Sequence, residues 1–274
     1  MQLAFVKMRG AGNEIVVVDQ RVQNTLPPGP ETIRRLGDSS SGPGFDQLMW
    51  LGPSTDGSTT ASYRVFNADG SEVEQCGNGV RCVALLLARS GGDRFLLESP
   101  TGHIEARVLD NNRIAVNMGA PQFAPDSVPF QAEAEALTYE LAVDGEVFQV
   151  AVLSMGNPHC VLDVDDVATA EVARLGPLIE QHPRFPARVN VGFMHRIDRA
   201  NIELRVFERG VGETPACGTG ACAAVVAGRR LNRLDTEVAV QLPGGQLVVS
   251  WHGGREPGWL TGSAEFISEG MIDL

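Results

Sequence analysis

The chain contains 274 residues, of which 43% are hydrophobic and 20% are charged, a balance typical of globular proteins in water. Its formal net charge of −12 argues against a nucleic-acid partner, because binding to phosphates requires clustered Lys and Arg. No apolar stretch reaches membrane-spanning length, and five cysteines without a disulfide-framework spacing indicate reduced thiols, so we expect a cytoplasmic protein with no membrane partner.

The sequence also limits the cofactors that the protein can use. Lys7 is the only lysine and lies in a predicted strand; because a pyridoxal enzyme needs a lysine for its Schiff base, pyridoxal chemistry is not expected. The chain has neither a Cys-x-x-Cys pair nor a His-Glu-x-x-His motif, so no metal site is indicated. We therefore expect an activity that needs no cofactor and no metal.

In chain order, hydrophobic periodicity and turn residues predict many short strands and a few helices. The predicted strands are residues 3–8, 15–19, 48–51, 62–66, 95–98, 103–108, 113–117, 137–143, 147–153, 161–164, 189–194 and 202–207, followed by strands and turns over 238–267. The predicted helices are residues 31–36, 80–88, 171–181 and 221–231, the third of them broken by Pro177. A Gly- and Pro-bearing segment at 118–121 is the predicted boundary between two halves.

The two halves repeat one pattern. Arg64-Val65-Phe66 precedes Cys76-Gly77-Asn78-Gly79, and Arg205-Val206-Phe207 precedes Cys217-Gly218-Thr219-Gly220 at the same spacing, about 141 residues later. A glutamate stands four positions before each cysteine, and an apolar helix follows each glycine-rich turn. This pattern indicates an internal duplication in which each half offers one thiol to a site between the halves.

Each cysteine is predicted to stand at the start of a helix, where unpaired N–H groups and the helix dipole favour a thiolate and attract anions. Three interpretations remain open for Cys76 and Cys217: ordinary core packing, a reversible disulfide, or a pair that moves a proton. In the last case one thiolate removes a proton from a stereogenic carbon and the opposite thiol delivers one to the other face. The helix N–H groups would bind the developing enolate.

Polar side chains beside the predicted strands are candidates for binding a substrate. Asn13 follows Gly12 in the turn between the first two strands, although an ordinary hairpin turn explains the same residues. Gly156-Asn157 repeats this pair in the second half, and Asn190 repeats Gln47, which stands at a strand entrance. Amides converging on one site would suit a substrate that is zwitterionic and polar at both ends.

The long motifs around both cysteines resemble those of the diaminopimelate epimerases. The segments from Asn67 to Cys82 and from Glu208 to Gly220 are similar to the two signatures of that family, and Met155-Gly156-Asn157-Pro158-His159 is similar to a third. The resemblance covers essentially the whole chain. It departs from the family at Glu14-Ile15, where an Asp-Phe pair is usual, which affects the detail of the first loop only.

The resemblance implies the interconversion of L,L- and meso-diaminopimelate without a cofactor, in lysine and peptidoglycan synthesis. It implies Cys76 and Cys217 as the acid and base, with His159 and Glu208 tuning their pKa values. It implies these substrate-binding residues: Asn13, Gln47, Asn67, Gly77, Asn78, Asn157, Asn190, Glu208, Arg209, Gly218 and Thr219. Arg209 would pair with a distal carboxylate, and Glu208 with an ammonium group. Cys82, Cys160 and Cys222 are expected to be buried packing residues.

The fold implied by the resemblance is α/β (α+β), with two pseudo-symmetric domains that each wrap a curved, mostly antiparallel sheet around a central helix. The expected domains are residues 1–117 with 263–274, and residues 118–262, in a homodimer. A proline or hydroxyproline racemase, which also uses two cysteines, is the nearest alternative, and a thiol redox sensor is the alternative from another class. Glu208-Arg209 favours diaminopimelate, because that substrate has a second charged end.

Overall fold

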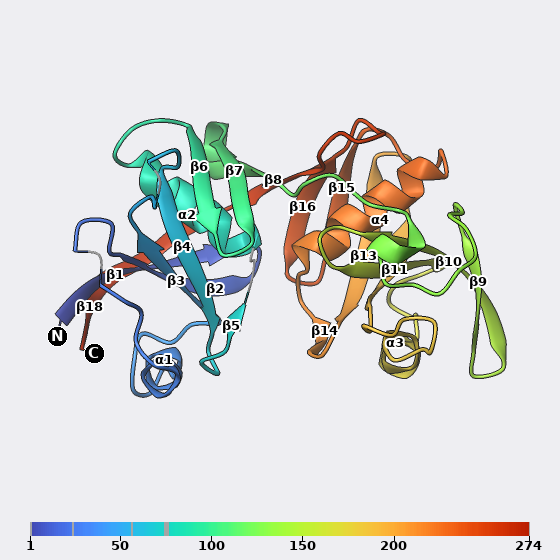
Figure 1. Ribbon diagram of the computed structural model, residues 1–274, viewed down its shortest axis with the longest axis horizontal. Helices are drawn as coiled ribbons and strands as arrows, with labels where there is room; N and C mark the ends of the chain where they lie inside the picture. The colour runs from blue at the N-terminus through green and yellow to red at the C-terminus, as the bar shows by residue number, and fades with distance from the viewer. Residues whose placement is uncertain (1, 24, 56, 74–76, 274) are drawn as a thin grey trace. The chain divides into compact units, whose positions relative to one another are not determined.

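The computed structural model describes residues 2–23, 25–55, 57–73 and 77–273, and the chain folds into two compact units (Figure 1). Unit 1 comprises Met1–Asn117 with Thr261–Leu274, and unit 2 comprises Met118–Leu260. The last segment of the chain therefore returns to the unit in which the chain began, where β1 and β18 lie side by side.

Unit 1 is built mainly of strands, with one short outer helix and one longer inner helix. Its elements are β1 (Gln2–Gly10), β2 (Asn13–Asp19), α1 (Pro30–Gly37), β3 (Gln47–Gly52), β4 (Ala61–Asn67), β5 (Glu72–Val73), α2 (Gly77–Ala88), β6 (Arg94–Ser99), β7 (Gly102–Val108), η1 (Asp110–Asn112), β8 (Arg113–Asn117) and β18 (Glu265–Asp273). Strand β17 (Trp259–Ser263) contains the boundary at which the chain leaves unit 2.

Unit 2 is likewise built mainly of strands, with one outer helix and one inner helix. Its elements are η2 (Pro125–Ser127), β9 (Tyr139–Val143), β10 (Glu146–Ser154), β11 (Pro158–Asp163), α3 (Val172–Glu180), β12 (Asn190–Arg196), β13 (Asn201–Glu208), β14 (Gly212–Thr214), α4 (Gly218–Arg230), β15 (Glu237–Leu242) and β16 (Gly245–Ser250).

The strand order is the same in both units. In unit 1 the order β18-β1-β2-β3-β4-β6-β7 is antiparallel except at the pairs β2–β3 and β4–β6. In unit 2 the order β9-β10-β11-β12-β13-β15-β16 is antiparallel except at β11–β12 and β13–β15, the corresponding pairs. The predicted duplication is therefore confirmed at the level of topology.

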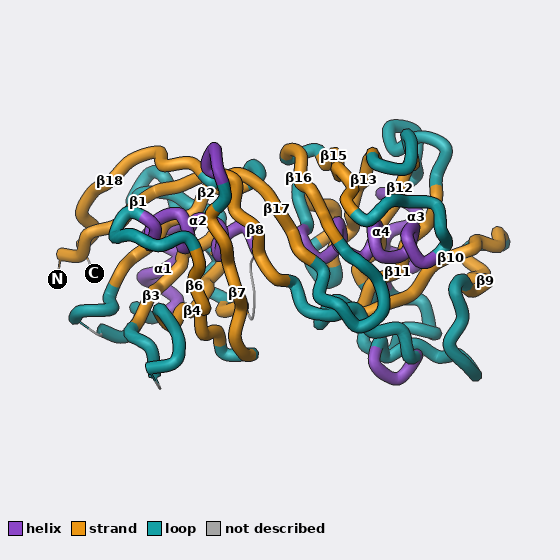
Figure 2. Tube along the Cα trace, turned by 90° about the horizontal axis from the view of Figure 1, so that it is seen from above, coloured by secondary structure: helices purple, strands orange, loops and turns teal. Residues whose placement is uncertain are grey.

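The parallel pairs explain where the helices stand. Parallel neighbours cannot be joined by a tight hairpin and need a crossover connection, usually a helix. The connections from β2 to β3 and from β11 to β12 carry α1 and α3, and those from β4 to β6 and from β13 to β15 carry α2 and α4. Each unit thus has one outer helix, drawn below its strands in Figure 1, and one inner helix, α2 or α4, which lies among the strands in Figure 2.

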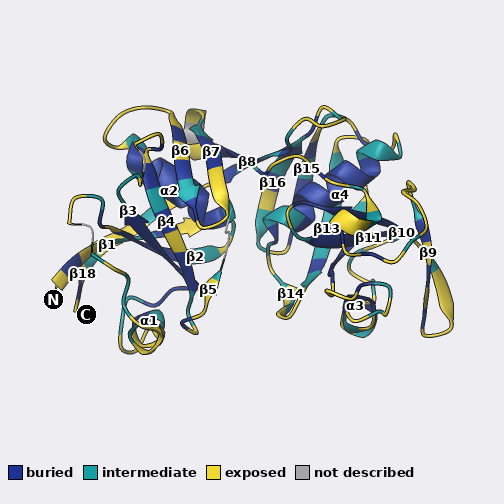
Figure 3. Cartoon of the chain, in the orientation of Figure 1, coloured by how far each residue is buried: buried dark blue, intermediate teal, exposed yellow. Residues whose placement is uncertain are grey.

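The inner helices are almost wholly buried because their sequences are apolar on every side. From Asn78 to Leu85 every residue of α2 is buried, and the same holds from Gly220 to Gly228 in α4 (Figure 3). Helix α2 contacts strands from both ends of its sheet, β1 to β3 as well as β6 to β8, so the sheet curves around it. This arrangement confirms the predicted fold, a curved sheet around a central helix.

One ion pair is repeated at the same place in each unit. Arg64 binds Glu72 through two hydrogen bonds of 2.7 and 2.6 Å, and Arg205 binds Glu213 through two of 2.6 and 2.9 Å. These arginines belong to the duplicated Arg-Val-Phe segments, and the glutamates are those that stand four positions before each cysteine. The bidentate pairs hold the turn before each inner helix against the preceding strand.

The structure corrects some predicted elements. Helix α3 runs through Pro177 instead of breaking there: the only internal bond that proline removes is the one to the carbonyl of Ala173, and the flanking Val172, Leu175 and Ile179 are buried in the core. The inner helices begin at Gly77 and Gly218, three residues earlier than predicted, because the glycine-rich turns are already their first turns.

Strand β11 begins at Pro158, so it includes His159 and Cys160, while β9 begins only at Tyr139. Within the parts of the chain that the structure describes, no helix is both long and apolar enough to cross a membrane.

Candidate active site

Three amide residues of unit 1 lie at the same end of neighbouring strands. Gln47 begins β3, pairs with Ile15 of the parallel strand β2, and pairs with Asn67 at the end of the antiparallel strand β4. Its Nε2 donates to Oδ1 of Asn67 at 3.3 Å. Asn13 begins β2 two residues before Ile15. The sheet register therefore brings Asn13, Gln47 and Asn67 together, as predicted from residues far apart in the sequence.

The first turn of α2 joins this group. Asn78 is buried, with 7% of its surface exposed, and its Nδ2 donates to Oδ1 of Asn13 at 2.6 Å. Gly77 is the first residue of the helix. Cys76, the predicted catalytic thiol of this half, lies outside the described residues.

Arg81 fixes the direction of these hydrogen bonds. It is fully buried in α2, and its Nη2 donates to Oδ1 of Asn78 at 2.6 Å. A guanidinium group only donates, so the oxygen of Asn78 must face Arg81 and its nitrogen must face Asn13. The oxygen of Asn13 is then occupied by Asn78, and its Nδ2 donates to Oδ2 of Asp46 at 3.4 Å. Sequence reasoning missed Arg81, although a cation in an apolar helix is a usable signal.

In unit 2 a different series of polar groups lies beside the first turn of the inner helix α4. Nε2 of His159 lies 2.9 Å from Oδ1 of Asn157, and Nδ2 of Asn157 donates to Oγ1 of Thr219 at 3.3 Å. Oγ1 of Thr219 lies 3.6 Å from Sγ of Cys217. The predicted residues Asn157, His159, Cys217 and Thr219 are thus linked in one hydrogen-bonded series.

His159 is only 1% exposed, and its burial, with a smaller contribution from the charge of Arg209, lowers its pKa from 6.5 to about 3. The ring is therefore neutral at physiological pH, with one nitrogen able to donate and one able to accept.

Cys217 caps the N-terminus of α4, immediately before Gly218, and is 5% exposed. Burial raises the pKa of its thiol, and the negative charge of Glu208 raises it further. The hydrogen bonds from Thr219 and from the backbone of Gly220 lower the pKa but do not offset those causes. The raised pKa favours the thiol form of Cys217, against the pull of the helix N-terminus toward a thiolate, and a thiol is the form that can donate a proton.

Asn190 and Arg209 form a second group in unit 2. Asn190 begins β12 and is 3% exposed; its Nδ2 donates to the carbonyl of Pro158 at 2.9 Å, and its Oδ1 accepts from the backbone N–H of Arg209 at 3.0 Å. The guanidinium group of Arg209 donates to the carbonyl of Ala187 at 3.2 Å and has no carboxylate partner among the described residues. Glu208, at the end of β13, accepts a hydrogen bond from Thr214.

The remaining described cysteines, Cys82, Cys160 and Cys222, are fully buried, as predicted. Burial raises the pKa of Cys160, so that this thiol is inert at physiological pH. Among the described residues, no group of three or more His, Cys, Asp or Glu side chains is placed to hold a metal ion.

Solved structures with this arrangement define the class of fold. A hydroxyproline epimerase from Agrobacterium vitis matches with a TM-score of 0.69 at 17% identity, over 99% of this chain and 92% of that one. A phenazine biosynthesis protein of the PhzF family from Bacillus anthracis matches with a TM-score of 0.69 at 16% identity, over all of both chains. The protein thus has the duplicated α/β fold that these proteins share.

Sequence comparison identifies the family within that class. The family model described as diaminopimelate epimerase matches residues 5–124 and 151–267. The chain is 52% identical to a diaminopimelate epimerase of Laribacter hongkongensis and 48% identical to one of Thioalkalivibrio sulfidiphilus, with both chains covered completely in each case. The chain belongs to the diaminopimelate epimerase family, which confirms the resemblance inferred from its cysteine motifs.

The low pKa of His159 predicts how stability depends on pH. The unfolded chain binds a proton at this residue below pH 6.5, whereas the folded chain does so only near pH 3, so stability falls as the pH decreases through this window. Between pH 7 and pH 5, His159 alone should remove about 2 kcal/mol from the free energy of unfolding. Urea unfolding of the wild type and of His159→Gln at both pH values measures this difference. An equal loss in both proteins would contradict the prediction.

The buried network predicts that Arg81 matters for activity. In Arg81→Met the side chain keeps much of its length but no longer orients Asn78, so kcat/KM should fall about tenfold or more, the effect of losing a hydrogen bond to a charged group. Arg89→Met, which removes an exposed arginine just beyond the same helix, is the matched control. Steady-state kinetics and thermal unfolding of both variants separate lost activity from lost folding. Unchanged kinetics in Arg81→Met would mean that Asn78 does not need this partner.

Proposed function

We propose that the protein interconverts L,L- and meso-diaminopimelate by moving the proton of one α-carbon, in lysine and peptidoglycan synthesis. The observation that carries this proposal is the buried thiol of Cys217 at the first turn of α4, in a chain about half identical to diaminopimelate epimerases over its full length. An isomerase of this kind needs a proton donor held in the dry environment that keeps it protonated, and Cys217 meets this requirement.

In the proposed mechanism the thiolate of Cys76 removes the α-proton from one face, and the thiol of Cys217 delivers its own proton to the other face. The reaction in the opposite direction uses the same groups with their roles exchanged. The negative charge that develops on the reacting carboxylate is stabilised by N–H groups at the starts of α2 and α4, from Gly77, Asn78, Gly218 and Thr219. The raised pKa of Cys217 supports its assignment as the donor in the resting enzyme.

The distal end of the substrate carries a second carboxylate and a second ammonium group. Arg209, whose guanidinium group has no carboxylate partner among the described residues, is proposed to bind the carboxylate. Glu208 is proposed to bind the ammonium group. The remaining contacts are proposed to come from the amides of Asn13, Gln47, Asn67, Asn157 and Asn190. A hydroxyproline-type substrate lacks this second charged end and would leave Arg209 unused.

The proposed reaction needs no pyridoxal cofactor. Lys7, the only lysine, lies in β1, where its Nζ is 2.7 Å from a carboxylate oxygen of Glu14 and donates to the carbonyl of Pro43 at 3.0 Å. A lysine held as an ammonium in this way is a poor candidate for a Schiff base. The free, buried cysteines of the described chain are consistent with a reducing compartment, and we propose a cytoplasmic location.

Proton exchange with solvent tests the mechanism directly. Reduced protein with L,L-diaminopimelate in D2O, without added cofactor, should place deuterium on one α-carbon as the meso isomer appears in proton NMR spectra. Cys76→Ala and Cys217→Ala should each lose about 100-fold or more of the epimerisation rate, because each lacks a proton-transfer group. Cys222→Ala, which removes a buried packing thiol, is the control. Exchange on proline or hydroxyproline with diaminopimelate untouched would favour the alternative substrate class.

We also propose that the protein is a homodimer. Strand β18 pairs with β1 on one side and has no strand partner on its other side among the described residues of unit 1. It exposes 43% of Ile267 and 59% of Met271, an apolar edge that association with a second copy would cover.

Sedimentation should therefore give twice the chain mass of 29.3 kDa for the wild type. Met271→Glu should shift the protein toward the monomer, because a carboxylate is costly to bury. Val147→Glu, at an exposed apolar residue of β10 in unit 2, should remain dimeric. A wild-type protein that sediments as a monomer at all concentrations tested would refute the dimer.

A further inference from the structure

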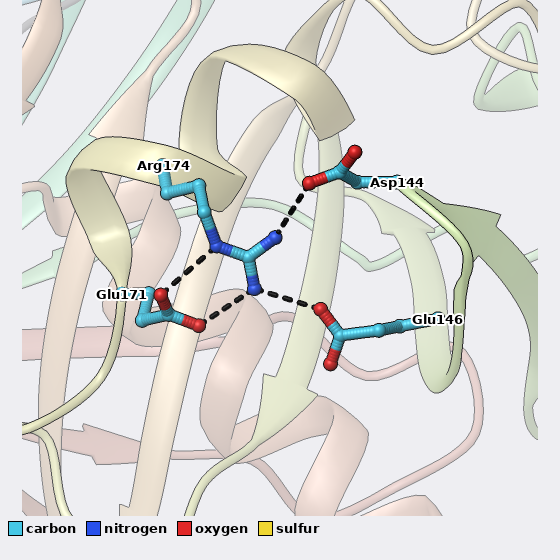
Figure 4. Close-up of polar contacts among 4 residues, drawn as sticks. All are labelled: Asp144, Glu146, Glu171 and Arg174. Carbon is cyan, nitrogen blue, oxygen red and sulfur yellow. Dashed lines mark hydrogen bonds and ion pairs between the residues drawn. The ribbon is translucent and has the colours of Figure 1, made fainter.

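Helix α3 carries a buried carboxylate, that of Glu180, at its C-terminal end, where a negative charge is unfavourable. Glu180 is the last residue of α3 and only 4% exposed. The C-terminal end of a helix carries partial negative charge, and burial removes the hydration of a carboxylate, so both effects disfavour Glu180 at this position. At the other end of α3, Glu171 is exposed and has the favourable position for a carboxylate (Figure 4). Unlike Glu171, Glu180 therefore needs specific contacts that compensate for its unfavourable position.

The side chain of Glu180 contacts the segment that follows β13. Oε1 of Glu180 accepts a hydrogen bond from the backbone N–H of Gly210 at 2.7 Å, and the same oxygen lies 3.7 Å from Nη1 of Arg188. Gly210 is in a left-handed conformation, with φ of 75°, in the turn between β13 and β14. A charged acceptor at 2.7 Å makes this a strong hydrogen bond for a backbone group.

Arg209 is consequently held on both sides. Its own N–H donates to Asn190, and the next N–H along the chain, that of Gly210, donates to Glu180. Both acceptors are buried side chains, one from β12 and one from α3. Two successive peptide groups fixed in this way leave the backbone of Arg209 little freedom to rotate. The bond from its Nη1 to the carbonyl of Ala187 then fixes the direction of the side chain.

From these contacts we infer that Glu180 is a positioning residue for Arg209, and that it thereby sets how tightly the enzyme holds the distal carboxylate of its substrate. The inference rests on the proposed function, in which Arg209 binds that carboxylate. An exposed arginine that must first become ordered pays a cost in side-chain entropy on binding, and a preordered one avoids it. The contacts of Glu180 are to Gly210 and Arg188 and not to Cys217, the described thiol of the proposed pair, so its effect belongs in substrate binding.

The test is the division of the effect between KM and kcat. Glu180→Ala should raise KM for diaminopimelate about tenfold with kcat changed less than about threefold, since it removes a charge-assisted hydrogen bond to the binding loop. Glu180→Gln, which keeps an oxygen acceptor for Gly210, should recover most of the affinity. Glu171→Gln, at the exposed end of the same helix, should behave as the wild type. A fall in kcat with KM unchanged, or no kinetic effect of Glu180→Ala, would overturn the inference.

A double-mutant cycle shows whether the effect passes through Arg209. On the background of Arg209→Ala, the further change Glu180→Ala should alter kcat/KM by less than about twofold, because the group that it positions is gone. Independent effects that multiply would mean that Glu180 acts by another route. If instead the wild type does not exchange the α-proton of diaminopimelate, the proposed function itself is wrong, and this result is distinct from a failure of the inference about Glu180.

Hydrogen exchange tests the contact without any variant. The amide of Gly210 should exchange slowly in the wild-type protein although the residue is exposed, because its hydrogen is bonded to a buried carboxylate. This measurement applies even if Glu180→Ala does not fold. Rapid exchange at Gly210 in a folded protein would overturn the inference.

Discussion

Two apolar helices, α2 and α4, begin within the folded units, and the first turn of each presents backbone N–H groups that have no partner inside the helix. The first turn of any helix leaves such groups without partners, and burying them unpaired is costly. The parallel strand pairs make these inner crossovers necessary, and the sheet then closes around them. The helix starts are therefore sites that demand an acceptor, which in the proposed reaction is the carboxylate of the substrate.

The two units share a backbone plan but satisfy the polar groups around it differently. In unit 1 the series of hydrogen bonds starts on the inner helix, at Arg81, and runs through Asn78 to Asn13. In unit 2 the position equivalent to Arg81 is Cys222, and a neutral His159 on the neighbouring strand takes over, acting through Asn157. The two units thus share a backbone arrangement but differ in the charged residues around it. The two thiols therefore need not have equal proton affinities.

The protonation of Cys217 shows which of two opposing effects is larger. The helix N-terminus and Thr219 favour a thiolate, but burial and the charge of Glu208 favour the thiol, and together they prevail. A local motif therefore placed the sulfur correctly without predicting its charge. The same balance applies to Glu180, where burial and the helix dipole are both unfavourable and a hydrogen bond to the loop of Arg209 compensates. In both cases the burial of a charge is decided by contacts from other elements.

The sequence by itself determined the family, the duplication and most of the strands, because these depend on periodicity and on motifs that are local in the chain. It also identified predicted site residues that the fold brings together within each unit, such as Asn13 with Asn78 and Asn157 with Thr219. It failed where distant contacts decide: α3 continues through Pro177 because its apolar face is buried, and neither Arg81 nor Glu180 was recognised. Only the tertiary structure reveals such partners, since the free energy of a buried polar group depends on atoms that approach it from elsewhere in the fold.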